Sequence, residues 1–155
     1  MLRILAVCTG NTCRSPMAEA LCVKLLAERL GCRPAELPRH GFLVLSAGLA
    51  AVPGDQAAAE AVATVQELGG DLSGHESRPL TAELVAQADY LITMTQGHAA
   101  ALAGRFARHN PRPRLLCPQG TDIADPIGGD AEVYRHCGRQ ILEHLQQLVP
   151  ELHQS

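Results

Sequence analysis

One junction constrains this chain more than any other feature: a cysteine that stands six residues before an Arg-Ser-Pro triplet. It reads Cys8-Thr9-Gly10-Asn11-Thr12-Cys13-Arg14-Ser15-Pro16. Residues 3–7 predict a short buried strand before it, and residues 17–30 place apolar side chains at helical spacing after it. The junction therefore predicts a strand–loop–helix unit that brings together a thiol, a run of backbone amides and a guanidinium.

Strand and helix patterns alternate along the rest of the chain. Further strands are expected at 42–46, 89–94 and 114–117, and further helices at 56–68, near 82, at 96–107 and at 131–148. The residues expected to cap the helices at their N-termini are Ser15, Asp55, Thr81 and Thr95. This order predicts an α/β fold: one three-layer domain over residues 1–155, with a four-stranded parallel sheet and helices on both faces.

Composition narrows the class of protein. The chain has 155 residues, 46% of them hydrophobic, and a formal net charge of -3, which does not favour a nucleic-acid partner. No apolar run has the length of a membrane-spanning helix, and the N-terminus lacks a signal-peptide pattern. We therefore expect a cytoplasmic monomer, with its six cysteines reduced and without a metal or organic cofactor.

The loop has the residue types that nucleophilic attack on a phosphate requires. The thiolate of Cys8 is the nucleophile, and the successive amides of residues 9–14 can curl around an anion at the start of a helix. Arg14 offers a planar fork for two phosphate oxygens, and Ser15 can donate to the thiolate. We therefore predict Cys8 and Arg14 as catalytic residues.

The intervening residues are predicted to bind the substrate phosphate. Gly10 permits a tight turn, and Asn11 tolerates a left-handed conformation while its amide ties the loop together. The expected phosphate-binding residues are Thr9, Gly10, Asn11, Thr12, Cys13 and Ser15. A Walker motif is excluded because no Gly-Lys pair is present. The plainer alternative is a buried cysteine at a strand end followed by an ordinary helix.

The junction is similar to the phosphate loop of the low-molecular-weight protein tyrosine phosphatases and of their protein arginine phosphatase branch. The resemblance covers nearly the whole chain and includes Ser46-Ala47-Gly48, Gly74-His75-Glu76-Ser77, Ala88-Asp89 with Met94, and Asp125-Pro126. It implies a phosphotyrosine phosphatase I-like fold and hydrolysis of a phosphorylated protein substrate through a thiophosphate intermediate.

Asp125 supplies the second chemical group. A carboxylic acid on a loop that faces the cysteine can protonate the leaving group and then activate water, and Pro126 restricts the backbone that aims it. The resemblance implies that Asp125 is the general acid. Asp122 is expected to be a solvated loop carboxylate.

Thr12 is the residue that indicates which phosphorylated amino acid is the substrate. By resemblance, tyrosine phosphatases of this family carry an aliphatic residue there and arginine phosphatases carry threonine, whose hydroxyl can bond water or substrate. By resemblance, tyrosine phosphatases of this family often place tyrosines after the Asp-Pro pair to flank an aromatic substrate, whereas this chain has Ile127-Gly128-Gly129. The Gly-Gly pair resembles the arginine branch, and Ile127 departs from it, because an aromatic residue at that position is more typical. We therefore expect a phosphoarginine phosphatase.

Three alternatives stay open. The first is a tyrosine phosphatase of the same family. The second is a thiol-dependent arsenate reductase, which needs a nearby cysteine pair, whereas Cys117 and Cys137 are isolated. The third is a non-catalytic phosphate-binding module.

Several residues are expected to support the loop. His75, Ser77 and Ser46 are interpreted as residues that hold it from outside. Cys13 is either a partner for a reversible disulfide with Cys8, which the resemblance supports, or a small core residue.

Overall fold

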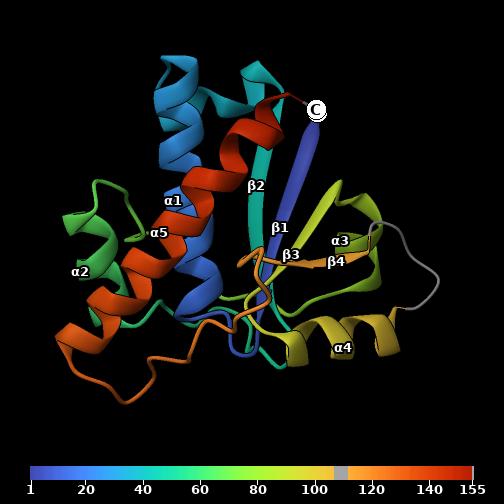
Figure 1. Ribbon diagram of the computed structural model, residues 1–155, viewed down its shortest axis with the longest axis vertical. Helices are drawn as coiled ribbons and strands as arrows, with labels where there is room; N and C mark the ends of the chain where they lie inside the picture. Colours follow the sequence, from blue (N-terminus) through green and yellow to red (C-terminus); the bar gives the residue numbers. More distant parts are fainter. Residues whose placement is uncertain (107–111, 155) are drawn as a thin grey trace.

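Four parallel strands form the central sheet of the computed structural model, which describes residues 1–106 and 112–154 (Figure 1). They are β1 (Leu2–Cys8), β2 (Phe42–Gly48), β3 (Tyr90–Thr93) and β4 (Pro113–Leu115), in the spatial order β2-β1-β3-β4. The β1–β2, β1–β3 and β3–β4 pairings are all parallel, which confirms the predicted sheet.

Helices cover both faces of the sheet. One face carries α1 (Arg14–Leu30), α2 (Ala59–Glu67) and α5 (Ala131–His153), and the other carries α3 (Ala82–Gln87) and α4 (Gln96–Arg105) (Figure 1). Alternate side chains of a strand point to opposite faces, so β1 contributes Ile4 and Ala6 to one core cluster and Leu5 and Val7 to the other. The three-layer α/β fold is confirmed.

Two of the predicted helix caps are wrong. Helix α1 begins at Arg14 with Cys13 at its N-cap, so Ser15 lies inside the first turn. Helix α2 begins at Ala59, and the N–H of Asp55 instead donates to Ser77 Oγ at 2.9 Å. The Ser15 hydroxyl faces the Cys8 sulfur, and the backbone of Asp55 pairs with Ser77, which lies 22 residues away.

The other element boundaries differ less. Thr81 and Thr95 do cap α3 and α4, because their hydroxyls accept from the N–H groups of Leu84 and His98. The short 3-10 helix η1 (Pro34–His40) was not predicted, and α5 continues five residues beyond the expected end at 148. The expected last residue of the helix at 96–107 lies outside the described residues.

The loops that matter chemically leave the carboxyl edge of the sheet. The Cys8–Arg14 loop follows β1, and the Asp125 loop (residues 118–130) follows β4. The N–H of Ile123 donates to the carbonyl of Met94 at 2.9 Å, which anchors the Asp125 loop beyond the end of β3. The strand order changes direction at β1, which lies between β2 and β3, and this is the topological switch point, where ligands bind in folds of this kind. The first loop begins there, and the Asp125 loop reaches it through its bond to Met94.

No helix within the described ranges combines the length and the apolar character needed to cross a bilayer.

Gly48, the last residue of β2, has no room for a side chain. A Cβ there would lie 2.5 Å from the carbonyl oxygen of Thr9 and 2.8 Å from Ala51 Cβ. We expect Gly48→Ala to lower the free energy of unfolding by about 2–3 kcal/mol, because backbone and loop must shift. Urea denaturation measures this. Gly74→Ala is the control, since no atom lies within 4 Å of its added Cβ, and an equal loss in both variants would contradict the expectation.

Candidate active site

The thiol of Cys8 lies at the end of β1 and is 3% exposed. Its sulfur is 2.9 Å from Ser15 Oγ, in the first turn of α1. Ser15 Oγ accepts a hydrogen bond from Asn11 Nδ2 at 2.9 Å, so its own hydrogen is directed to the Cys8 sulfur at 2.9 Å or to the Ala47 carbonyl at 3.5 Å. The side chain that the sequence placed at a helix cap thus faces the nucleophile.

The carbonyl groups of the Cys8–Arg14 loop point away from its centre. Five of them accept a hydrogen bond from a group outside the loop: Cys8 from Leu49 N, Thr9 from Ala50 N, Asn11 from His75 Nε2, Thr12 from Ala58 N and Cys13 from Met17 N. Among the described residues, the N–H groups of residues 9–13 meet no acceptor. A loop whose carbonyls are bound outside and whose amides are free can bind an anion at its centre.

Asn11 fixes this arrangement. It is fully buried and has a φ of 58°, in the left-handed region that only a few non-glycine residues adopt. Its Nδ2 donates to Ser15 Oγ and Ser46 Oγ, both at 2.9 Å, and its Oδ1 accepts from Arg78 N at 2.9 Å. The left-handed turn therefore falls on Asn11, and Gly10 does not have a positive φ.

Arg14 connects the two loops. Its guanidinium is 7% exposed, its Nη1 donates to the carbonyl of Ile123 at 3.0 Å, and its Nη2 lies 3.4 Å from Asp125 Oδ2. The carboxyl of Asp125 is 44% exposed, and its Oδ1 accepts from Ile127 N at 3.1 Å. The structure thus brings Arg14 and Asp125 together although 110 residues separate them in the sequence.

Cys13 lies behind the loop rather than at its centre. Its sulfur is 3.4 Å from the hydroxyl of Tyr134 on α5 and 3.8 Å from Thr12 Oγ1. Burial raises the pKa of the Cys13 thiol, so it stays protonated at neutral pH. Both Cys8 and Cys13 are free thiols, and whether they form a disulfide stays a prediction.

The remaining loop residues lie at the rim. Thr12 is half-buried and Gly10 is half-buried, whereas Thr9 is exposed and its Oγ1 is 3.0 Å from His98 Nε2. These positions agree with contact to a bound phosphate group.

The expected supporting residues are confirmed in two cases of three. His75 Nε2 contacts the carbonyl of Asn11 at 2.7 Å, and Ser46 Oγ accepts from Asn11 and donates to Glu19 Oε1 at 2.6 Å. Burial raises the pKa of the Glu19 carboxyl. The prediction for Ser77 is wrong, because its hydroxyl donates to the carbonyl of Val52 and so holds the loop after β2.

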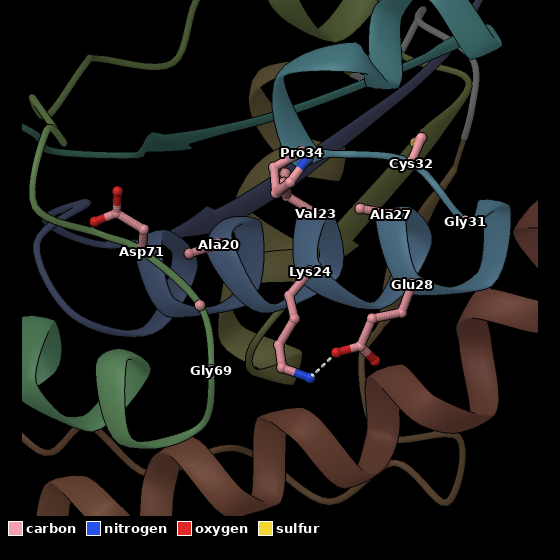
Figure 2. Close-up of a pocket in the computed structure, with 11 residues that line it drawn as sticks. Ala20, Val23, Lys24, Ala27, Glu28, Gly31, Cys32, Pro34, Gly69 and Asp71 are labelled. Atoms are coloured by element: carbon pink, nitrogen blue, oxygen red, sulfur yellow. Dashed lines mark hydrogen bonds and ion pairs between the residues drawn. The ribbon is translucent and has the colours of Figure 1, made fainter.

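A separate cavity of about 400 Å³ lies between α1 and the segments that follow α1 and α2 (Figure 2). Lys24 Nζ pairs with Glu28 Oε1 at 2.6 Å, and Asp71, the other charged lining residue, accepts hydrogen bonds from Ser73 (Figure 2). None of its lining residues belongs to the Cys8–Arg14 loop or the Asp125 loop. This cavity is therefore not part of the candidate active site.

Sequence reasoning missed three residues that contact the loop or its supports: Glu19, His98 and Tyr134. His98 and Tyr134 come from α4 and α5, far along the chain, and no local spacing points to either. Glu19 does follow the junction at helical spacing from Ser15, and that is the one signal the sequence contained.

The comparisons with known proteins agree with this geometry. The family profile described as low molecular weight phosphotyrosine protein phosphatase matches residues 3–155. The chain belongs to this family. A low-molecular-weight phosphatase of Bacillus subtilis (strain 168), named protein-arginine-phosphatase, is 39% identical over 153 residues, which cover 96% of this chain and 95% of the relative.

Two further relatives bear on the substrate. A probable low-molecular-weight protein-tyrosine-phosphatase, EpsP of Ralstonia solanacearum, is 40% identical over 153 residues, with 96% of this chain and 94% of the relative covered. The YwlE arginine phosphatase, solved as a cysteine-to-serine mutant with a phosphorylated active-site serine, matches with a TM-score of 0.85 and 37% identity over 97% of this chain and 95% of that chain. Overall identity therefore does not separate the two substrate classes.

Replacement of Asn11 tests the support of the loop. Asn11→Ala removes three buried hydrogen bonds and leaves alanine at a φ of 58°. We therefore expect the free energy of unfolding to fall by about 3 kcal/mol. Urea denaturation provides the measurement. The control Ser73→Ala loses exposed bonds to Asp71 and should change stability by less than about 0.5 kcal/mol. Equal stability of Asn11→Ala and the unaltered protein would refute this account of the loop.

Proposed function

We propose that this low-molecular-weight protein phosphatase hydrolyses phosphoarginine in proteins, with Cys8 as nucleophile, Arg14 as phosphate ligand and Asp125 as general acid. The observation that carries the proposal is the pairing of Arg14 with Asp125 at 3.4 Å beside the loop that begins at Cys8. This pairing supports a site that combines a thiol, an anion-binding loop and a proton donor.

In the first step, the thiolate of Cys8 attacks phosphorus and a sulfur–phosphorus bond forms. The free amides of residues 9–13 and the fork of Arg14 hold the equatorial phosphate oxygens as negative charge builds on them. Asp125 gives its proton to the departing guanidinium nitrogen as the phosphorus–nitrogen bond breaks. Because the phosphate dianion competes for Arg14, its binding releases the Asp125 carboxylate from the ion pair, and the carboxylate takes up a proton from solvent before it acts as the acid.

In the second step, water attacks the thiophosphate. Asp125, now ionised, takes a proton from the water, and the sulfur–phosphorus bond breaks to release inorganic phosphate and the Cys8 thiolate. The Ser15 hydroxyl, 2.9 Å from the sulfur, stabilises the departing thiolate. Neither step calls for a metal or an organic cofactor.

Thr12 supports arginine over tyrosine as the phosphorylated residue. Its hydroxyl lies half-buried at the loop, where it can orient the attacking water or bond the substrate guanidinium, and an aliphatic side chain cannot do either. Ile127 is 69% exposed close to Asp125 in the sequence, and its side chain is not an aromatic one that could flank a phosphotyrosine ring. The runner-up function is tyrosine phosphatase, because the EpsP relative, named a probable protein-tyrosine-phosphatase, is as similar to this chain as the arginine phosphatase relative.

The six cysteines of the chain are all free thiols, which supports action in the reducing cytoplasm. We propose a monomer, because Cys8, Arg14 and Asp125 all come from one chain. Cys117 contacts Gln119 and Cys137 contacts the Ala124 carbonyl, so neither supports an arsenate reductase relay.

Three substitutions test the catalytic roles. Cys8→Ser should abolish release of phosphate from p-nitrophenyl phosphate, since the hydroxyl is a far weaker nucleophile at neutral pH. Asp125→Asn should lower kcat on a phosphoarginine peptide by about 100-fold, the usual effect of removing a general acid. Asp71→Asn, an exposed loop carboxylate that bonds Ser73, is the control and should keep full activity. Undiminished turnover in Asp125→Asn would exclude this acid.

The substrate is tested with matched phosphoarginine and phosphotyrosine peptides. We expect kcat/KM to favour phosphoarginine, and Thr12→Ile to move the ratio toward phosphotyrosine by about 10-fold or more, because the hydroxyl that bonds water or guanidinium is lost. Thr12→Ser, which keeps the hydroxyl, should retain the preference. Faster hydrolysis of phosphotyrosine by the unaltered protein would establish the runner-up function instead.

A further inference from the structure

The first turn of α4 contacts both loops of the active site. His98 Nε2 lies 3.0 Å from Thr9 Oγ1 in the Cys8–Arg14 loop. Two residues earlier, the N–H of Gln96 donates to Asp122 Oδ1 and its Nε2 donates to the Gly120 carbonyl, both at 2.8 Å, in the Asp125 loop. Since α4 lies beside the carboxyl ends of the strands, its first turn spans the two loops (Figure 1).

His98 is an unusual side chain for this place. It is only 6% exposed, and its Nδ1 is buried with no hydrogen-bond partner among the described residues. A buried polar atom without a partner is costly, so a histidine whose side chain only packs would be better replaced by an apolar residue. The contact with Thr9 is the hydrogen bond that an apolar residue would lose.

The surroundings of His98 favour the neutral imidazole. Burial lowers the pKa of His98, and the nearby Arg14 lowers it further, against smaller opposing effects of Asp122 and Asp125. A proton on Nδ1 would create a buried donor without an acceptor beside a guanidinium. The neutral ring without a proton on Nδ1 carries it on Nε2, which then donates to the Thr9 hydroxyl.

We propose that His98 is a positioning residue of the phosphatase reaction: through Thr9, it fixes the Cys8–Arg14 loop relative to the Asp125 loop. The proposal rests on the proposed function only in taking Cys8 and Asp125 as nucleophile and acid. These groups lie on separate loops, and each must stand at a defined side of the phosphorus atom. A shift of about 1 Å between them is enough to slow such a reaction by up to about 100-fold.

Thr9 is the residue through which His98 positions the loop. It is the first residue after the nucleophile, and its side chain is exposed, so no core packing holds it in place. Its carbonyl is bound by Ala50 N at 2.9 Å on the β2 side of the loop. The bond to His98 holds the opposite side, toward α4.

A double-mutant cycle tests the proposal with p-nitrophenyl phosphate as substrate. His98→Leu and Thr9→Val should each lower kcat by about 10-fold, and the double variant should fall within about twofold of either, because all three lack the same hydrogen bond. His98→Gln and Thr9→Ser keep a polar partner and should restore kcat to within about threefold of the unaltered protein. Losses that simply multiply, or an unchanged kcat in His98→Leu, would overturn the proposal.

A control separates positioning from general support of α4. The control variant is Leu102→Val. Leu102 lies on the same helix and does not contact Thr9, and the substitution removes a methylene from the core cluster that contains Leu5 and Val7. It should lower Tm and leave kcat unchanged at a temperature where the protein is folded. A loss of kcat equal to that of His98→Leu at matched Tm would show that the helix only needs to be stable.

Nuclear magnetic resonance supplies a readout that packing alone would not move. The imidazole nitrogens of His98 should report one neutral tautomer in the unaltered protein, and Thr9→Val should shift the Nε2 resonance while Leu102→Val does not. An Nε2 resonance indifferent to Thr9→Val would count against the bond. Because p-nitrophenyl phosphate contains no amino acid, failure of the phosphoarginine assignment would leave these results interpretable.

Discussion

The buried side chain of Asn11 is the constraint on which the active site depends. Its three hydrogen bonds hold a left-handed backbone in a place without solvent, and that turn sends the loop carbonyls outward. Once the carbonyls are bound by outer partners, the amides are left facing the centre. Anion binding here is therefore built before any phosphate arrives, which is the condition for strong electrostatic stabilisation of a transition state.

Tertiary contacts reach this loop from every side. The segment after β2 binds the carbonyls of Cys8 and Thr9, His75 binds that of Asn11, and the segment before α2 binds that of Thr12. Helix α5 contributes Tyr134 behind Cys13. Such a loop resists displacement because its tethers come from several separate segments of the chain.

The predictions from sequence succeeded where the signal is periodic and failed where it depends on a distant partner. Alternating strand and helix patterns predicted the parallel sheet, and the spacing of Cys8 and Arg14 indicated an anion site at a strand–helix junction. The caps at Ser15 and Asp55 were wrong: the Ser15 hydroxyl faces Cys8, and the backbone N–H of Asp55 bonds Ser77 while α2 begins only at Ala59. The contact of His98 with the loop was not predicted, because its partner, Thr9, lies 89 residues away.

The sequence by itself determined the chemical groups and their local order: a thiol at a strand end, amides in a loop, a guanidinium at a helix start and a carboxylate in a later loop. Only the tertiary structure decided which of these meet. The pairing of Arg14 with Asp125, and the bracing of the loop by Asn11 and His98, depend on how the strands order themselves in the sheet. The physical reason is that local propensities act within a few residues of the chain. The polar groups of a buried loop, in contrast, need hydrogen-bond partners, and the fold supplies these from distant parts of the sequence.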